Sequence, residues 1–311
     1  MKRYQFLRRH ISIFILIHIT LIVDAQQTGI LTVQWGEFGD KPGQFRFPAM
    51  IVSDKNSNIF VVDQHNHRIQ KFDQNGNFIL MWGRQGSTPA EFKFPYGIAL
   101  DSRGFVYVTD MYNNRIQKFS PDGVFIAATG TYGTWDDQMK YPYGIAIDGN
   151  DILYVIDAFN YRVLKYSTDL RFLSQWGSQE SIGFKLYMPH EIAVAGDGNI
   201  IMSDRQNHRV SVFSPDGILI KRFGDFGEGE NSTGCLFSEP HGIAVNKNGD
   251  IFVCDRYNFR IQKFSSGGEF QALWKTSGES DNSRHFPLGI AAAQNGSVYV
   301  SDHYAHCIQK Y

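Results

Sequence analysis

The sequence contains six copies of one segment at a nearly constant pitch, and this repetition limits the fold more than any other feature. Each copy opens with a proline, and successive prolines are 47, 47, 47, 51 and 47 residues apart. A repeat of about 40 to 50 residues is typical of propellers, whose units bury their apolar surfaces against one another. The prolines are Pro48, Pro95, Pro142, Pro189, Pro240 and Pro287, and each copy keeps an aspartate at Asp63, Asp110, Asp157, Asp204, Asp255 or Asp302.

Each copy has the residue pattern of four short strands. Runs of β-branched and aromatic residues alternate with turn residues such as Ser102–Gly104 and Pro121–Gly123. The 25 Phe and 15 Tyr of the chain also favour strands over helices. In the second copy the expected strands are Gly97–Leu100, Phe105–Thr109, Arg115–Phe119 and Val124–Thr129. The sequence therefore predicts an all-β fold, a six-bladed β-propeller with four antiparallel strands per blade.

The two ends of the chain complement each other. The sixth copy stops at Tyr311 after its third strand, and Thr28–Gly36 matches the fourth strand of the first copy, Asn75–Gly83. We expect the N-terminal strand to pair into the last blade and close the ring, because closure removes exposed sheet edges.

The first residues have the pattern of a secretory signal peptide. Lys2, Arg3, Arg8 and Arg9 precede the apolar run Ile11–Val23, which is followed by small residues. We expect a signal peptide over residues 1–25, a propeller over 26–311, secretion, and no membrane span in the mature chain. The mature chain is mildly acidic, so nucleic acid is not an expected partner.

The loop after the second strand carries a recurring Asp-x-x-Asn-x-Arg pattern. Asp63, Asn66 and Arg68 show it in the first copy, while the sixth copy departs with Ala305 and Cys307. We interpret the pattern as architectural: the polar side chains bond loop backbone and the arginine pairs with a carboxylate. The tryptophan slot near the end of each copy is interpreted as core between blades. Its members are Trp35, Trp82, Trp176 and Trp274, with Thr129 and Phe223 as replacements.

Together, Pro-x-Gly-Ile-Ala-x-Asp and Asp-x-x-Asn-x-Arg-Ile-Gln-Lys-Phe, as in Pro95–Asp101 and Asp110–Phe119, resemble the NHL repeat. The resemblance covers nearly the whole mature chain and implies the propeller fold. It leaves several functions open: the protein-binding or RNA-binding domains of tripartite-motif ubiquitin ligases, sensor domains of receptor kinases, and peptidyl-hydroxyglycine amidating lyases.

The residue after each proline varies and is expected at the mouth of the central channel. Tyr96, Tyr143, His190 and His241 are the candidate ligand-binding rim, with Ala49 and Leu288 completing the set. The alternative is that this position needs only an amphipathic side chain.

Two of these histidines suggest an alternative with a metal. Met188-Pro189-His190-Glu191 is similar to a zinc-binding segment of the amidating lyases, which would make His190 and His241 zinc ligands. The copies holding them are adjacent, and a third histidine ligand is not recognisable. A calcium-dependent hydrolase is a separate alternative, with Asp and Asn side chains in the channel as oxygen ligands. No catalytic residue is assigned, because no nucleophile or nucleotide motif is present in the sequence.

Secretion would allow covalent modification. We predict a Cys235–Cys254 disulfide that leaves Cys307 free, and glycosylation at Asn231 and Asn295, which lie in Asn-x-Ser/Thr sequences.

Three functions follow in order of support. The first is a secreted, non-catalytic propeller that binds an extracellular protein, peptide or glycan on its loop-rich face and needs no cofactor. The second is a zinc- or calcium-dependent lyase or hydrolase. The third is an RNA-binding or ubiquitin-ligase-related domain, against which the signal peptide and the acidic charge argue.

Overall fold

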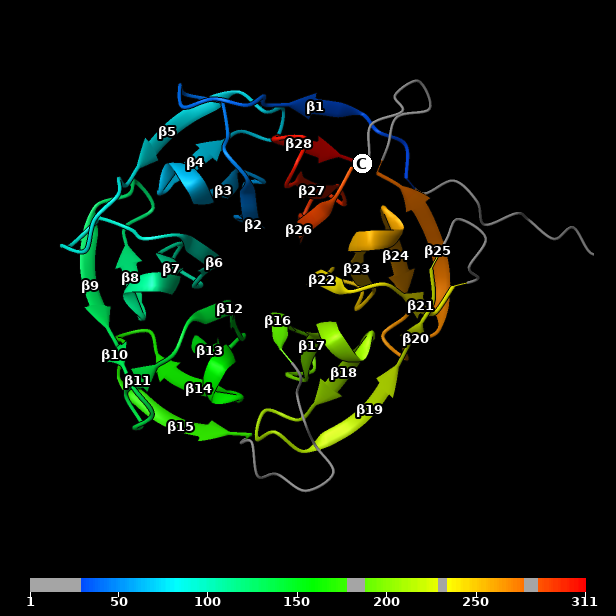
Figure 1. Cartoon of the computed structure of the whole chain (residues 1–311). Helices are drawn as coiled ribbons and strands as arrows, with labels where there is room; N and C mark the ends of the chain where they lie inside the picture. Colours follow the sequence, from blue (N-terminus) through cyan, green and yellow to red (C-terminus); the bar gives the residue numbers. More distant parts are fainter. Residues whose placement is uncertain (1–28, 178–187, 229–233, 277–284) are drawn as a thin grey trace, which may run out of the picture.

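The computed structural model describes residues 29–177, 188–228, 234–276 and 285–311, which form a closed ring of six four-stranded antiparallel sheets (Figure 1). The expected six-bladed propeller is confirmed. The expected signal peptide and Asn231 lie outside the described residues. Within these ranges no helix is long and apolar enough to cross a membrane.

Each blade runs from an inner strand at the channel to an outer strand at the rim. The strands of blades one to three are β2 (Pro48–Ser53), β3 (Ile59–Asp63), β4 (Arg68–Phe72), β5 (Phe78–Trp82); β6 (Pro95–Leu100), β7 (Val106–Asp110), β8 (Arg115–Phe119), β9 (Phe125–Thr129); β12 (Pro142–Ile147), β13 (Ile152–Asp157), β14 (Arg162–Ser167), β15 (Phe172–Trp176). Those of blades four to six are β16 (Pro189–Val194), β17 (Ile200–Asp204), β18 (Arg209–Phe213), β19 (Leu219–Phe223); β22 (Pro240–Val245), β23 (Ile251–Asp255), β24 (Arg260–Phe264), β25 (Phe270–Lys275); β26 (Pro287–Ala292), β27 (Val298–Asp302), β28 (Cys307–Lys310), β1 (Val33–Trp35).

Short elements join these strands on one face of the ring. In blades one to five a single 3-10 turn links the second strand to the third: η1 (Gln64–Asn66), η2 (Met111–Asn113), η3 (Ala158–Asn160), η4 (Arg205–Asn207), η5 (Arg256–Asn258). Two of the connections between blades contain small parallel pairs, β10 (Thr131–Tyr132) with β11 (Gln138–Met139) and β20 (Asp225–Phe226) with β21 (Leu236–Phe237).

Both ends of the described chain lie in the sixth blade. Strand β1 pairs antiparallel with β28, with Val33 opposite Lys310 and Trp35 opposite Ile308. Figure 1 shows the dark blue β1 beside the red β28 at the rim of the ring. This pairing gives the sixth blade its outer strand and leaves no gap between it and the first blade.

The core is divided among the interfaces between blades. Successive side chains of a strand point to opposite faces, so each strand contributes to two interfaces. In β3, Val61 packs against Tyr299 and Ala291 of blade six, while Val62 packs in the cluster shared with Ile98 of blade two. The tryptophan slot belongs to these cores, as expected, since Trp35, Trp82, Trp176 and Trp274 all pack there.

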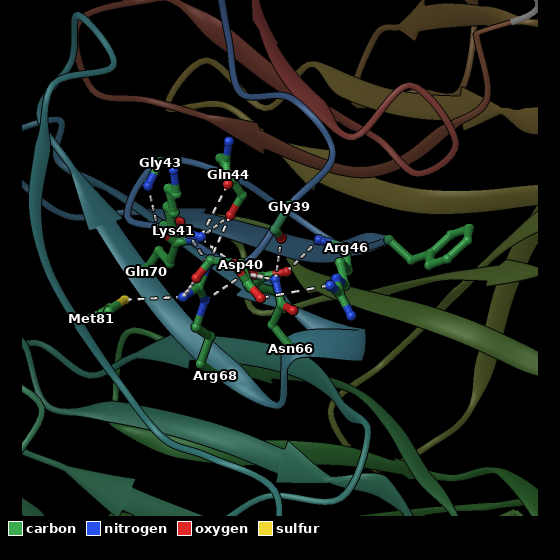
Figure 2. Close-up of polar contacts among 12 residues, drawn as sticks. Gly39, Asp40, Lys41, Gly43, Gln44, Arg46, Asn66, Arg68, Gln70 and Met81 are labelled. Carbon is green, nitrogen blue, oxygen red and sulfur yellow. Dashed lines mark hydrogen bonds and ion pairs between the residues drawn. The ribbon is translucent and has the colours of Figure 1, made fainter.

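The Asp-x-x-Asn-x-Arg pattern ties each blade to the loop that leads into it. Figure 2 shows Arg68 reaching the backbone of the 39–44 loop, where its Nη1 and Nη2 donate to the carbonyl oxygens of Asp40 (2.6 Å), Lys41 (2.9 Å) and Gln44 (2.9 Å). The Nε of Arg68 donates to Asp63 Oδ2 at 2.7 Å, and Asp63 is fully buried. These contacts confirm the architectural interpretation.

The sixth blade replaces this arginine with a histidine from elsewhere in the chain. His285 Nδ1 lies 2.6 Å from Asp302 Oδ2, and both side chains are buried. Cys307, at the usual arginine position, packs in the core instead.

The predicted Cys235–Cys254 disulfide is wrong. Cys235, Cys254 and Cys307 are free thiols. Cys254 packs between blades five and six, whereas Cys235 packs against the core between blades four and five. The alternation of β23 places Val253 on the Cys235 side and Cys254 on the opposite face, so the sheet of blade five separates the two sulfur atoms.

Candidate functional site

The channel mouth is formed where the six inner strands begin. The residue before the strand proline is left-handed in five blades, with φ of 50–54° at Phe47, Phe94, Tyr141, Met188 and Glu239. Each inner strand also has a register shift just after its proline. This kink directs the residue after the proline toward the ring axis.

Side chains of the preceding blade stabilise this uncommon backbone conformation. His67 Nδ1 accepts from the N–H of Phe94 at 3.1 Å, and His306 Nδ1 accepts from Phe47 N–H at 3.1 Å. His208 makes the same bond to Glu239 N–H. These three histidines therefore have a structural role, because each accepts a backbone N–H of the neighbouring blade.

The four predicted rim residues come together at the mouth. The hydroxyl of Tyr96 lies 2.8 Å from His190 Nδ1. The rings of Tyr96 and Tyr143 are 5.0 Å apart, those of Tyr143 and His190 are 4.7 Å apart, and those of His190 and His241 are 4.5 Å apart. Their packing forms a plug rather than an open rim: Tyr96 and His190 are 6% exposed and His241 is fully buried, while Tyr143 is partly exposed. Their role in ligand binding stays a prediction.

Two arginines cover the plug. Arg205 Nη1 lies 3.2 Å from His190 Nε2, and Arg256 Nη1 lies 2.8 Å from His241 Nε2. Because arginine only donates, both Nε2 atoms are acceptors and the imidazoles are neutral with Nδ1 protonated. The Nδ1 of His241 donates to the carbonyl oxygen of Glu239 at 2.9 Å.

Burial and charge both favour these neutral imidazoles. Burial, reinforced by Arg205 and Arg256, holds the pKa of His190 well below its usual value. The pKa of His241 is also well below its usual value, first through burial and then through His190 and Arg256.

This donor set does not fit the zinc or calcium alternative. A zinc ion needs a free imidazole lone pair, and at His190 and His241 that lone pair accepts an arginine N–H. Across the described ranges, no three His, Cys, Asp or Glu side chains gather as a metal-binding group. We therefore derive no chemistry through a metal here.

The two arginines differ in whether a carboxylate balances their positive charge. Arg205 Nε donates to Glu239 Oε2 at 2.7 Å. Arg256 has no carboxylate partner among the described residues and lies over the rings of Tyr257 and Tyr304, at 5.5 and 5.9 Å. Its Nε atom is buried and has no hydrogen-bond partner within the described part of the chain.

Aromatic and histidine rings surround this centre in an almost complete circle, which we call the aromatic belt. Neighbouring rings in the belt lie 4.5–5.9 Å apart. Four members are 42–51% exposed although they are large and apolar: Tyr112, Phe159, Tyr257 and Tyr304. In order around the face, the belt comprises Tyr257, Phe286, Tyr304, Phe47, His65, Phe94, Tyr112, Tyr141 and Phe159.

The belt is interrupted at blade four, where the ion pair of Arg205 and Glu239 lies. Our sequence interpretation missed the belt. Its signal lies in two slots of the repeat. The residue before the proline is aromatic except at Met188 and Glu239, and the second residue after the conserved aspartate is aromatic or histidine except at Gln206.

Comparisons with known proteins agree with the fold. Four segments match the NHL repeat, over residues 92–119, 186–213, 237–264 and 285–311. Protein brain tumor of Drosophila melanogaster is 39% identical over 66 residues, 21% of this chain, and B-box type zinc finger protein ncl-1 of Caenorhabditis elegans is 48% identical over 50 residues, 16% of this chain. The matches span only 6% and 5% of those two proteins.

A solved streptogramin B lyase superposes with a TM-score of 0.59 and 17% identity, over 86% of this chain and 93% of the lyase. At that identity the superposition shows a shared fold alone.

Proposed function

We propose that this NHL-repeat β-propeller is a secreted, non-catalytic module that binds an extracellular protein or peptide on the face formed by the aromatic belt. The observation that supports it best is that four belt members remain 42–51% exposed although they pack against neighbouring rings: Tyr112, Phe159, Tyr257 and Tyr304. A contiguous apolar surface of this kind is typical of interaction sites.

The composition of this face favours a protein partner. Tyrosine and arginine are enriched among residues that contribute most to protein–protein affinity, since they combine large contact area with hydrogen bonding. Tyr257 and Tyr304 flank Arg256, whose charge has no carboxylate partner among the described residues. A partner that places an aspartate, a glutamate or a terminal carboxylate above Arg256, with apolar side chains over the belt, would match both features.

A crosslinking experiment tests this proposal. A photoreactive phenylalanine analogue replaces Tyr257 in one sample and Ile220 in another; Ile220 is an exposed apolar residue on the outer strand β19. The purified protein is irradiated in extracellular fluid of the organism that produces it. We expect a discrete crosslinked protein with the Tyr257 substitution and none with Ile220, and the band should weaken when Arg256→Ala is added.

Other results would contradict the proposal. Equal crosslinking from both positions would indicate nonspecific contact. Binding of glycans on an array, or RNA binding with a steep salt dependence, lost in the same Arg256→Ala variant, would assign the face to another ligand class. N-terminal sequencing of the protein recovered from medium tests secretion, with an expected start at Gln26.

A further inference from the structure

One acidic side chain lies inside the central channel. Glu191 follows His190 on β16, is 7% exposed, and its Oε2 atom has no hydrogen-bond partner among the described residues. Its carboxylate lies over the inner strand of blade three, where a Cβ placed on Gly144 would be 3.1 Å from Glu191 Oε1. The other blades hold small or apolar residues at this position: Met50, Gly97, Gly144, Gly242 and Gly289.

Glu191 lies at one end of a cavity of about 200 Å³ that the six inner strands enclose. Ser53 is the other polar side chain among the described lining residues, and the rest are aliphatic or methionine. The cavity is closed at the loop-rich face by the buried plug of Tyr96, His190 and His241. It is accessible from the opposite face, because Ser53 and other residues near the ends of the inner strands are partly exposed.

The channel wall also offers backbone acceptors. Strands β2, β6, β12, β16, β22 and β26 are each the edge strand of their sheet on the channel side. The outward N–H and C=O groups of an edge strand have no ladder partner. Inner-strand carbonyl oxygens without such a partner are therefore candidate acceptors for a ligand in the channel, whereas those of Ala49 and Tyr143 already accept from Ser301 and Thr109.

We propose that this channel binds a small primary ammonium compound with a short apolar body, with its ammonium group on Glu191. A buried carboxylate without a counter-charge is costly, and a bound cation removes that cost. An ammonium group brings three N–H donors, one for Glu191 and two for the strand-edge carbonyls. The apolar body then contacts the aliphatic wall, including Leu100 and Ile147.

Size and donor count separate this ligand from others. An apolar cavity of about 150 Å³ accommodates benzene in an engineered protein, so a channel of about 200 Å³ has room for a four-carbon amine. Calcium prefers six to eight oxygen ligands, usually with more than one carboxylate, and Glu191 is the single carboxylate among the described residues that line the cavity. The site lies below the plug and is separate from the proposed partner face.

Calorimetric titration of the mature protein with n-butylammonium chloride, in phosphate buffer, tests the proposal. We expect butylammonium to bind the wild type saturably and to bind Glu191→Gln at least tenfold more weakly. We expect 1-butanol, which has the same apolar body without the charge, not to bind. Glu269→Gln is the matched control, because it makes the same change at an exposed residue and should bind as the wild type does.

Glu191→Gly is a second variant, which restores the residue present in four other blades and should also lose binding. Equal affinity of the wild type and Glu191→Gln would overturn the proposal. So would calcium binding that depends on Glu191 without binding of butylammonium. Crosslinking from Tyr257 should be unchanged in Glu191→Gln, so failure here is distinguishable from failure of the proposed partner face.

Discussion

His285 and Asp302 form a buried pair at 2.6 Å in the blade that lacks the usual arginine. The imidazole supplies Asp302 with the donor that Arg68 supplies to Asp63 in the first blade. The sixth blade thus keeps a buried aspartate with a partner from a different part of the repeat.

We predict that His285→Ala destabilises the propeller by about 3 kcal/mol, because it leaves the Asp302 carboxylate buried without this partner. Urea unfolding followed by fluorescence measures the change. Adding Asp302→Asn to His285→Ala should recover part of the loss, since the charge is then removed as well. A loss below about 1 kcal/mol for His285→Ala would show that Asp302 is satisfied by its other contacts.

The substitution Arg68→Lys should lower the free energy of unfolding by about 2 kcal/mol, although it preserves the positive charge. A lysine cannot reproduce the planar fork that reaches Asp63 and the 39–44 loop together. Arg84→Lys is the control, because the Arg84 side chain is 82% exposed and pairs with Glu91 at the surface. Equal stabilities of the two variants would indicate that the loop contacts of Arg68 contribute little.

Glu191 should make the protein less stable as the pH rises. Burial raises the pKa of Glu191 well above its usual value, so above pH 4.5 the folded state retains a proton that the unfolded state has released. The free energy of unfolding then falls by at most about 1.4 kcal/mol per pH unit until the folded-state pKa is reached. Glu191→Gln removes this dependence, and its advantage over the wild type should grow between pH 5 and pH 8 in amine-free buffer. A constant difference over that range would contradict this explanation.

His303 should make the protein less stable as the pH falls, which is the opposite of the effect of Glu191. Burial, chiefly, lowers the pKa of His303 from 6.5 to about 4. Between these values the unfolded state binds a proton that the folded state excludes, so stability decreases as the pH falls. His303→Asn keeps a donor for the carbonyl oxygen of Pro48, 3.1 Å from His303 Nδ1, and should flatten the unfolding curve between pH 6.5 and pH 4 relative to the wild type. An unchanged slope would assign the acid sensitivity to other histidines, such as His190 and His241.

Thiol titration checks the cysteine assignment. Protein unfolded without reductant should give three reactive thiols, since no disulfide joins Cys235, Cys254 and Cys307. The folded protein should react slowly at Cys254 and Cys307, which are buried; burial raises the pKa of Cys307 to about 12. A count of one thiol after unfolding would contradict this assignment, because it would show that two of the three cysteines form a disulfide.

The repeat predicted what is the same in every blade, because strand lengths, turns and the Asp63–Arg68 pairing depend on residues close together in sequence. The missed features depend on contacts between distant positions. His285 compensates for Cys307 from 22 residues upstream, and His67 acts on the backbone of Phe94 in the next blade. The separation of Cys235 from Cys254 by the sheet of blade five depends on strand parity at Cys254, which the cysteine spacing does not give. Tyr96, Tyr143, His190 and His241 contact one another at the channel mouth, but their burial depends on how closely the inner strands approach the axis.

The β1–β28 pairing also determines when the fold becomes complete during synthesis. Thr32 and Lys310, which hydrogen-bond beside this pair, are 278 residues apart. At about 5 to 20 residues per second, β1 waits roughly 15 to 55 s for its partner to leave the ribosome. Throughout that time β1 is an unpaired β-strand, open to the edges of other sheets. Synthesis of β28 ends this exposure, and a chain that stops before Cys307 would keep β1 unpaired however well its other blades had folded.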